Sequence, residues 1–322
     1  MLRFLLALPL VLAACADAPV GSKERPFTMY FVPSVDAETI ATNADDLTAF
    51  VAKEVSQELY GNDDGFHIKS AIPTSYIAVV EAFSTGRADF AALNTFSYVL
   101  AKDVKNYPIE AILTVVRGKD ETHYKGQFLA AADSGIEKIQ DLEGKKFAYV
   151  DVASTAGYLL PSATLKEAGI TLGETVLAHK HDNVVMMIYQ GQVDAGATYY
   201  SPPKVETGPD GTTHEVPRDA RARVATQYPD VYEKVRIIGF TDDTPNDAWV
   251  LRTNLEVSGV SQEQVKAAVS KALLKFAATD QGKAALESLY NISGLAPADD
   301  ARYESIRKLV RESDLNLETA VK

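Results

Sequence analysis

The feature that most constrains the fold is a repeated alternation of strand-like and helix-like segments. Residues 27–32 (FTMYFV) predict a strand, and residues 37–59, with apolar residues at helical spacing, predict a helix. The same order recurs further along, with strands expected at 66–70, 88–92 and 109–117 and helices at 75–84 and 95–102. This alternation is typical of a mostly parallel sheet with helices on both faces.

A second series of the same kind follows. Its strands are predicted at 126–132, 147–150, 175–178 and 193–198, and its helices at 155–168 and 183–190. Residues 201–218 are rich in Pro, Gly and Thr and indicate a surface loop or insertion. Strands at 235–240 and 248–252 then lead into a helical region from 261 to about 312. The sequence therefore predicts two α/β units and a helical C-terminal segment.

The N-terminal residues have the pattern of a secretory signal. Residues 1–14 (MLRFLLALPLVLAA) combine a short basic start with an apolar run too short to span a bilayer as a mature helix. Leu12-Ala13-Ala14-Cys15 resembles a bacterial lipobox, which predicts lipidation of Cys15 and a lipidated tether over residues 15–25. A plain secretory signal with an incidental cysteine is the alternative. Since Cys15 is the only cysteine, the sequence excludes disulfides and cysteine metal sites.

Charge and motifs exclude several classes of function. The chain has 32 Lys and Arg against 44 Asp and Glu, a net charge of −12, which argues against nucleic acid and against a polybasic membrane surface. It contains no G-x-S-x-G, H-E-x-x-H, Walker A or dinucleotide-binding motif. We therefore expect no cofactor, no metal and no enzymatic activity.

Polar residues gather where the expected strands give way to helices. In Ser154-Thr155-Ala156-Gly157, two hydroxyls precede a helix whose first amides lack partners, and such amides hold anions. Ordinary helix capping by Ser154 or Thr155 is the alternative. His181, which also stands before a helix, is a candidate donor to an oxyanion, and His179-x-His181 lacks an evident third metal ligand. Further candidate hydroxyl donors from other junctions are Tyr76, Thr95, Tyr98, Tyr199 and Tyr200.

Several segments, in order, resemble one family. They are GRADFAALNTFSYVLA, DSGIEKIQDLEGKKFAYVD, VDVASTAGYLLPSATLKEAGI, HDNVVMMIYQGQVDAGA and TPNDAWVLR. Together they resemble the PhnD-like phosphonate/phosphite/phosphate-binding proteins of ABC transporters, over nearly the whole mature chain. The resemblance implies a type II periplasmic binding protein fold, with two α/β lobes closing over a ligand cleft. It implies lobe 1 from residues 26–118 and 246–322 and lobe 2 from residues 119–245.

The resemblance also implies a binding site. The expected ligand-binding residues are Tyr76, Thr95, Ser154, Thr155, Ala156, His181, Tyr199 and Asp247. Ala156 stands where the family has a third hydroxyl. No acid follows the VDAGA segment, in contrast to members that hold an aminophosphonate's amine, so a smaller oxyanion or another phosphonate is favoured.

The expected function is capture of a phosphorus oxyanion by lobe closure and its delivery to an ABC permease. We expect a monomer in the periplasm or cell envelope, lipid-anchored to a membrane, with no nucleic-acid partner. Two alternatives remain open from sequence: a periplasmic receptor for a membrane sensor kinase, and an enzyme on the same fold that uses His181 with Asp182.

Overall fold

The computed structural model describes residues 18–208 and 210–312. The expected signal peptide and Cys15 lie outside the described residues. Within these ranges no helix is both long and apolar enough to cross a membrane.

The first sheet has six strands in the order β13-β4-β12-β3-β1-β2. The strands β1, β2 and β3 pair in parallel, whereas β12 inserts antiparallel between β3 and β4, and β13 pairs antiparallel with β4. The expected mostly parallel sheet is therefore mixed. The strand bounds are β1 Phe27–Phe31, β2 Ile68–Ala71, β3 Phe90–Leu93, β4 Ile109–Val116, β12 Ala248–Arg252 and β13 Gly294–Pro297.

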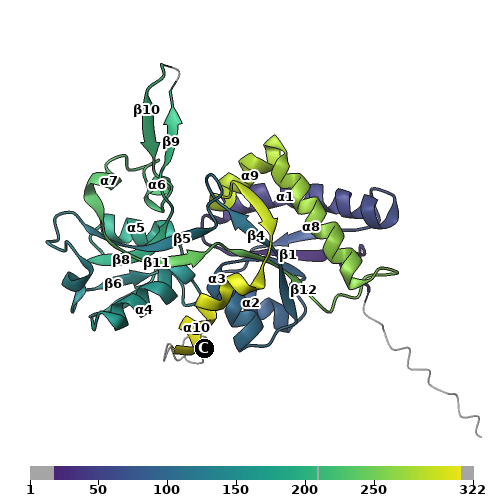
Figure 1. Ribbon diagram of the computed structural model, residues 1–322, viewed down its shortest axis with the longest axis horizontal. Helices are drawn as coiled ribbons and strands as arrows, with labels where there is room; N and C mark the ends of the chain where they lie inside the picture. Colours follow the sequence, from purple (N-terminus) through teal and green to yellow (C-terminus); the bar gives the residue numbers. More distant parts are fainter. Residues whose placement is uncertain (1–17, 209, 313–322) are drawn as a thin grey trace, which may run out of the picture.

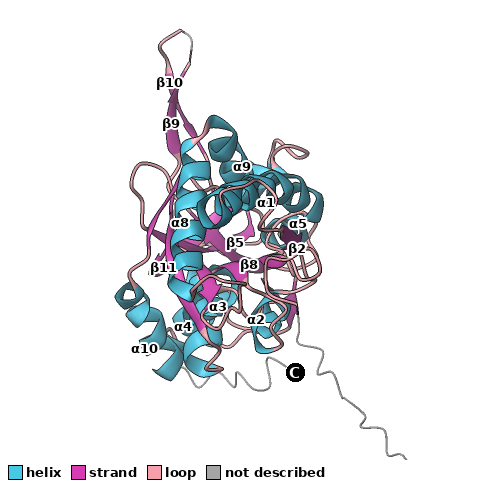
Figure 2. Ribbon diagram, turned by 90° about the vertical axis from the view of Figure 1, so that its right-hand side faces the viewer, coloured by secondary structure: helices cyan, strands magenta, loops and turns pink. Residues whose placement is uncertain are grey.

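Five helices pack against this sheet, and with it they form the unit that we call lobe 1. They are α1 Ala37–Tyr60, α2 Tyr76–Ser84, α3 Thr95–Val99 with its π-helical continuation Leu100–Val104, α8 Gln262–Ala278 and α9 Asp280–Tyr290. Figure 2 views the molecule from this lobe's end, where α1, α8 and α9 pack against one another. Their apolar faces bury one core on the sheet, and α2 and α3 bury another.

Polar junction residues start several of these helices. Asp36 caps α1, Ser75 caps α2 and Asn94 caps α3, each by accepting from amides of the first turn. The helix α1 ends at Gly61, whose φ of 67° is a left-handed conformation that favours glycine. The hydroxyl and amide side chains that follow the strands therefore have a local structural role.

The second sheet, of five strands in the order β11-β5-β8-β6-β7, lies beside the first (Figure 1). Its strands are β5 His123–Ala131, β6 Phe147–Tyr149, β7 Thr175–Leu177, β8 Ala195–Tyr200 and β11 Val235–Pro245. The associated helices are the 3₁₀ turn Ile139–Leu142, the π-helical turn Thr155–Leu159 leading into α4 Leu160–Glu167, then α5 His181–Tyr189, α6 Arg221–Val224 and α7 Val231–Lys234. We call this sheet with its helices lobe 2.

The described chain passes between the two sheets twice. Residues 117–122 connect β4 to β5, and residues 246–247 connect β11 to β12. The two crossovers are hydrogen-bonded to each other, because the Asn246 amide donates to the carbonyl of Thr122 at 2.9 Å. Any movement of one lobe relative to the other must therefore bend these two crossovers.

Three strands were not expected from sequence. Within the region expected as a loop or insertion, β9 Lys204–Thr207 and β10 Thr213–Val216 form a hairpin that projects from lobe 2 (Figure 1). The region expected to be wholly helical contains β13, an edge strand that ends in Pro297. The hairpin agrees with a surface insertion but not with a loop, and the prediction of a wholly helical C-terminal region was wrong. The strands were missed because they are short, with little apolar alternation.

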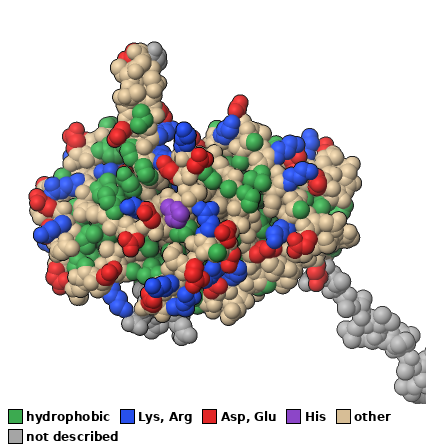
Figure 3. Space-filling model, in the orientation of Figure 1, with side chains coloured by type: hydrophobic (Ala, Val, Ile, Leu, Met, Phe, Trp, Pro, Cys, Tyr) green, Lys and Arg blue, Asp and Glu red, His purple; other side chains and the backbone are tan. Residues whose placement is uncertain are grey.

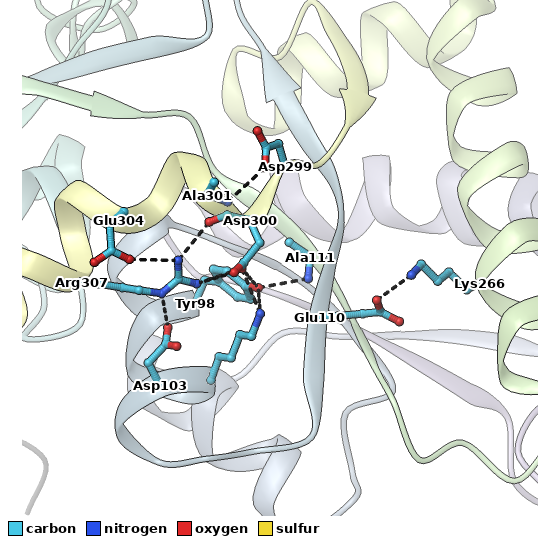
Figure 4. A network of polar contacts seen from close by, with 11 residues as sticks. Tyr98, Asp103, Glu110, Ala111, Lys266, Asp299, Asp300, Ala301, Glu304 and Arg307 are labelled. Atoms are coloured by element: carbon cyan, nitrogen blue, oxygen red, sulfur yellow. Dashed lines mark hydrogen bonds and ion pairs between the residues drawn. The ribbon is translucent and has the colours of Figure 1, made fainter.

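The C-terminal part of the described chain returns to lobe 1. The 3₁₀ turn Asp300–Tyr303 and α10 Glu304–Glu312 are held against α3 by an ionic network (Figure 4). Asp300 accepts from the hydroxyl of Tyr98 at 2.6 Å and pairs with Arg307 at 2.8 Å. Tyr98, one of the candidate hydroxyls, therefore serves this network and does not line the cavity described below.

The later part of the expected tether packs against lobe 1. Val20 is buried and its amide donates to the carbonyl of Glu256 at 2.8 Å. Arg25 forms an ion pair with the fully buried Asp89, which also accepts from Arg252 at 2.6 Å. Ordered packing therefore includes residues from about Val20 onward.

Candidate functional site

A cavity of about 70 Å³ lies where loops of both lobes meet. Seven of the eight expected ligand-binding residues line it: Tyr76, Ser154, Thr155, Ala156, His181, Tyr199 and Asp247. The structure adds other polar lining residues, which are Ser34, Asn94, Arg117, Tyr124, Ser201, Arg223, Tyr290 and Asn291, and apolar ones, which are Val32, Val35, Ala92 and Trp249. The strand-to-helix junctions thus converge on one small polar chamber.

The junction after β6 forms one wall of the cavity. The hydroxyl of Ser154 accepts from the Gly157 amide at 3.1 Å, so Ser154 is a helix cap. The amides of Thr155 and Ala156, in the same first turn, donate to no described acceptor. Gly157 fits closely, because a Cβ there would clash with Val150 and lie 2.9 Å from the Ser154 hydroxyl. Capping and two free amides therefore coexist at this helix start.

The Thr155 hydroxyl joins the two lobes at the edge of the cavity. It donates to the side-chain oxygen of Asn94 at 2.8 Å and accepts from the Phe96 amide at 2.9 Å. Thr95 lies outside the cavity lining, with its hydroxyl 3.0 Å from that of Thr155. Thr155 and Thr95 thus meet each other across the interface between the lobes.

Tyr76 and His181 present unused polar atoms to the cavity. Tyr76 is 2% exposed and His181 is 7% exposed, and neither the Tyr76 hydroxyl nor His181 Nδ1 has a hydrogen-bond partner. Burial raises the pKa of Tyr76 well above its usual range, which keeps its hydroxyl protonated and able to donate. Buried polar groups without partners cost free energy. An oxyanion in the cavity would satisfy them.

Arg117 and Asp247 face each other from the two crossovers. Arg117 Nη2 lies 2.8 Å from Asp247 Oδ2, and Nη1 donates to the side-chain oxygen of Asn246 at 2.9 Å. Burial opposes the charge of Arg117, but the nearby Asp247 carboxylate outweighs it and raises the pKa of Arg117. Asp247 Oδ1 is buried without a partner. Asp247 therefore lines the cavity and forms an ion pair with Arg117, and this pair links the two crossovers.

Sequence reasoning missed both arginines of the cavity. Arg117 follows the mostly apolar strand β4, at the end of the segment 109–117 expected as a strand, and that unusual position was an available signal. Arg223 lies in the four-residue helix α6, after the projecting hairpin. Nothing in its local sequence distinguishes it from a surface arginine, since only the tertiary fold brings α6 to the cavity.

The ionisation of His181 gives a testable dependence of stability on pH. Burial, with the positive charges of Arg223 and Arg117, lowers its pKa from 6.5 to about 3. The unfolded chain thus binds more protons between pH 3 and 6.5, and stability falls as the pH drops through this window. From pH 7 to pH 5 we expect the ligand-free protein to lose about 2 kcal/mol more than His181→Gln does, by urea unfolding.

The exposed His214, with a side chain 59% accessible, supplies the control. His214→Gln should keep the pH dependence of the wild type. Equal slopes for His181→Gln and the wild type would show that His181 is not held neutral by its site.

A family model described as "ABC transporter, phosphonate, periplasmic substrate-binding protein" matches residues 29–303. The chain belongs to this family. The resemblance inferred from the ordered segments is thereby confirmed. This is a family of periplasmic binding proteins.

Individual relatives have low sequence identity to this chain. "Phosphate-import protein PhnD" of Mycolicibacterium smegmatis is 27% identical over 212 residues, which are 59% of this chain. The aligned part spans 62% of that relative's length.

Solved structures share the fold. A binding protein component of an ABC phosphonate transporter from Pseudomonas aeruginosa superposes with a TM-score of 0.68 at 18% identity, covering 94% of this chain and 92% of the other. PhnD1 from Prochlorococcus marinus, in complex with methylphosphonate, also gives 0.68 at 18% identity, covering 89% and 97%. The expected type II periplasmic binding protein fold is confirmed.

Proposed function

We propose that this protein captures a small phosphorus oxyanion, namely a phosphonate, phosphite or phosphate, and delivers it to an ABC permease without chemical change. The observation that carries the proposal is the cavity between the lobes, with its buried, unpartnered donors. Family membership and the two named relatives, one a phosphate-import protein and one holding methylphosphonate, support the ligand class.

The donors and the positive charge of the cavity support binding of an anion. The Tyr76 hydroxyl, His181 and the amides of Thr155 and Ala156 supply donors, while Arg117 and Arg223 supply positive charge. Neutral His181 still donates one hydrogen bond from whichever ring nitrogen carries the proton. In the described ranges no group of three or more His, Cys, Asp or Glu side chains could hold a metal ion.

Binding would proceed by closure of the lobes, with residues 26–118 and 246–322 on one side and 119–245 on the other. Contacts between the lobes at Thr155 form only when they approach, and closure removes water from the charged ligand. The crossovers at 117–122 and 246–247 would be the hinges. We also propose a monomer anchored through a lipid on Cys15; size-exclusion chromatography and membrane fractionation of Cys15→Ser test these points.

Calorimetry of the mature domain tests the proposal. The panel is inorganic phosphate, phosphite, methylphosphonate and 2-aminoethylphosphonate, at protein concentrations suited to micromolar affinity. We expect binding of at least one of the first three, and weaker binding of 2-aminoethylphosphonate because no acid follows β8 to receive its amine. Absence of heat with every ligand would contradict the proposal.

A further inference from the structure

We propose that Arg223 is a ligand-binding residue that also fastens lobe 2 to lobe 1, so that one guanidinium links capture of the anion to closure. This inference rests on the proposed function and adds a residue to its site. It also states which part of lobe 1 responds to the ligand: the C-terminal turn of α9.

The Arg223 guanidinium makes a contact between the lobes through Nη2. From α6 in lobe 2, Arg223 Nη2 donates to the carbonyl oxygen of Ser288 at 2.9 Å and lies 3.3 Å from that of Leu289. These are among the last carbonyls of α9 in lobe 1, and the C-terminal end of a helix carries partial negative charge. The contact therefore exists only when the lobes are close, and it holds the arginine in a fixed orientation.

The same side chain belongs to the cavity. Arg223 lines it, and its Nε is buried without a hydrogen-bond partner. Among the described residues no carboxylate forms an ion pair with Arg223, whereas Arg117, the other cavity arginine, is paired with Asp247. Arg223 thus has neither a carboxylate partner for its charge nor an acceptor for its Nε–H among the described residues. An oxyanion would supply the negative charge and the acceptor together.

Neighbouring contacts place the same helix end against the rest of lobe 2. Asn291, in the left-handed cap of α9, donates to the hydroxyl of Tyr199 at 3.2 Å, and both residues line the cavity. Outside the cavity, Lys204 at the base of the hairpin pairs with Glu287 at 3.1 Å on the exposed surface. Lobe 2 therefore contacts α9 along the turn from Glu287 to Asn291. Of the two cations that contact this turn, Arg223 lines the cavity and Lys204 does not.

The consequence is a two-way coupling. An anion that accepts from Nε orients the guanidinium so that Nη2 can meet the α9 carbonyls, and closure in turn buries Nε against the anion. Glutamine at this position could reach one partner but carries no charge, and lysine keeps the charge but lacks the planar fork that serves two partners.

The experiment compares four proteins: wild type, Arg223→Gln, Arg223→Lys and Lys204→Gln. Calorimetry measures affinity for methylphosphonate, phosphite and inorganic phosphate, and small-angle X-ray scattering measures compaction on adding each anion. We expect Arg223→Gln to bind about 10–100-fold more weakly, as for loss of a charged hydrogen bond, and to show reduced compaction. Arg223→Lys should fall between Arg223→Gln and wild type.

The matched control is Lys204→Gln, which removes a cation that contacts the same helix end outside the cavity. Its affinity should stay within about threefold of wild type, as expected for an exposed pair. Arg223 variants that bind and compact as Lys204→Gln does would overturn the inference while leaving the proposed function intact. If Arg223→Gln fails to fold, Arg223→Lys decides by the same comparison. A wild type that binds none of the anions overturns the proposed function and the role of Arg223 with it.

Discussion

Replacing Arg117 with methionine should lower the free energy of unfolding by about 3–5 kcal/mol and remove oxyanion binding, because it leaves the Asp247 carboxylate at the cavity without its cation. Asn246 would lose the Arg117 Nη1 donor as well. The methionine keeps most of the apolar volume, so the loss reports the missing charge and hydrogen bonds. Urea unfolding at pH 7 and calorimetry with methylphosphonate measure the two effects.

The control for Arg117→Met is an exposed ion pair between the strands that adjoin the same crossovers. Lys125 on β5 lies 3.7 Å from Asp243 on β11, with side chains 40% and 63% accessible. Lys125→Met should cost no more than about 1 kcal/mol. If Arg117→Met and Lys125→Met lower the free energy of unfolding by the same amount, the buried Arg117–Asp247 pair does not stabilise the crossovers.

Replacing Thr155 with valine should weaken methylphosphonate binding by about 100-fold, with little change in the stability of either lobe. Valine has the shape of threonine but lacks the hydroxyl that bonds Asn94 and the Phe96 amide across the lobes. The loss of two such bonds, with the Phe96 amide left unsatisfied, corresponds to about 2–3 kcal/mol against the closed state. Apparent affinity falls with the fraction of binding-competent molecules.

The control for Thr155→Val is Thr164 in α4, a threonine whose hydroxyl bonds within its own helix and not across the lobes. Its hydroxyl donates to the Leu160 carbonyl of its own helix at 3.0 Å. Thr164→Val should bind within about twofold of wild type. Small-angle scattering should show that Thr155→Val compacts less on adding methylphosphonate; full compaction with unchanged affinity would refute a role for Thr155 in closure.

Hydrophobic periodicity was sufficient to predict most strands and helices, because strands such as β1, β3 and β6 are buried and apolar and are followed by polar residues at the start of the next helix. It failed for β9, β10 and β13, whose residues are mostly polar or include proline. These strands form through pairing with a partner strand, so their cause is not local. The return strand β12 was expected, but its antiparallel insertion between β3 and β4 depends on the path through the crossovers.

Much of the cavity could be predicted because its walls are strand-to-helix junctions, each readable as a short polar segment. Ser154 shows why the alternatives of capping and binding were not exclusive: its hydroxyl caps the helix, while Thr155 and Ala156, whose amides have no acceptor among the described residues, line the cavity. Ala156, 2% exposed, lines this wall, so the position where the resemblance implies a third hydroxyl lies at the cavity. Arg223 could not be predicted, since its position depends on long-range packing.

The placement of Trp249 gives the molecule an optical property. It is the only tryptophan of the chain, 1% exposed, edge-on to Phe90 at 5.7 Å, and it lines the cavity. The indole emission of the unlabelled protein therefore arises from one position, two residues after Asp247 of the second crossover and in the lining of the same cavity. Its wavelength and quenching report on water, charge and closure at the site itself, without any added fluorophore.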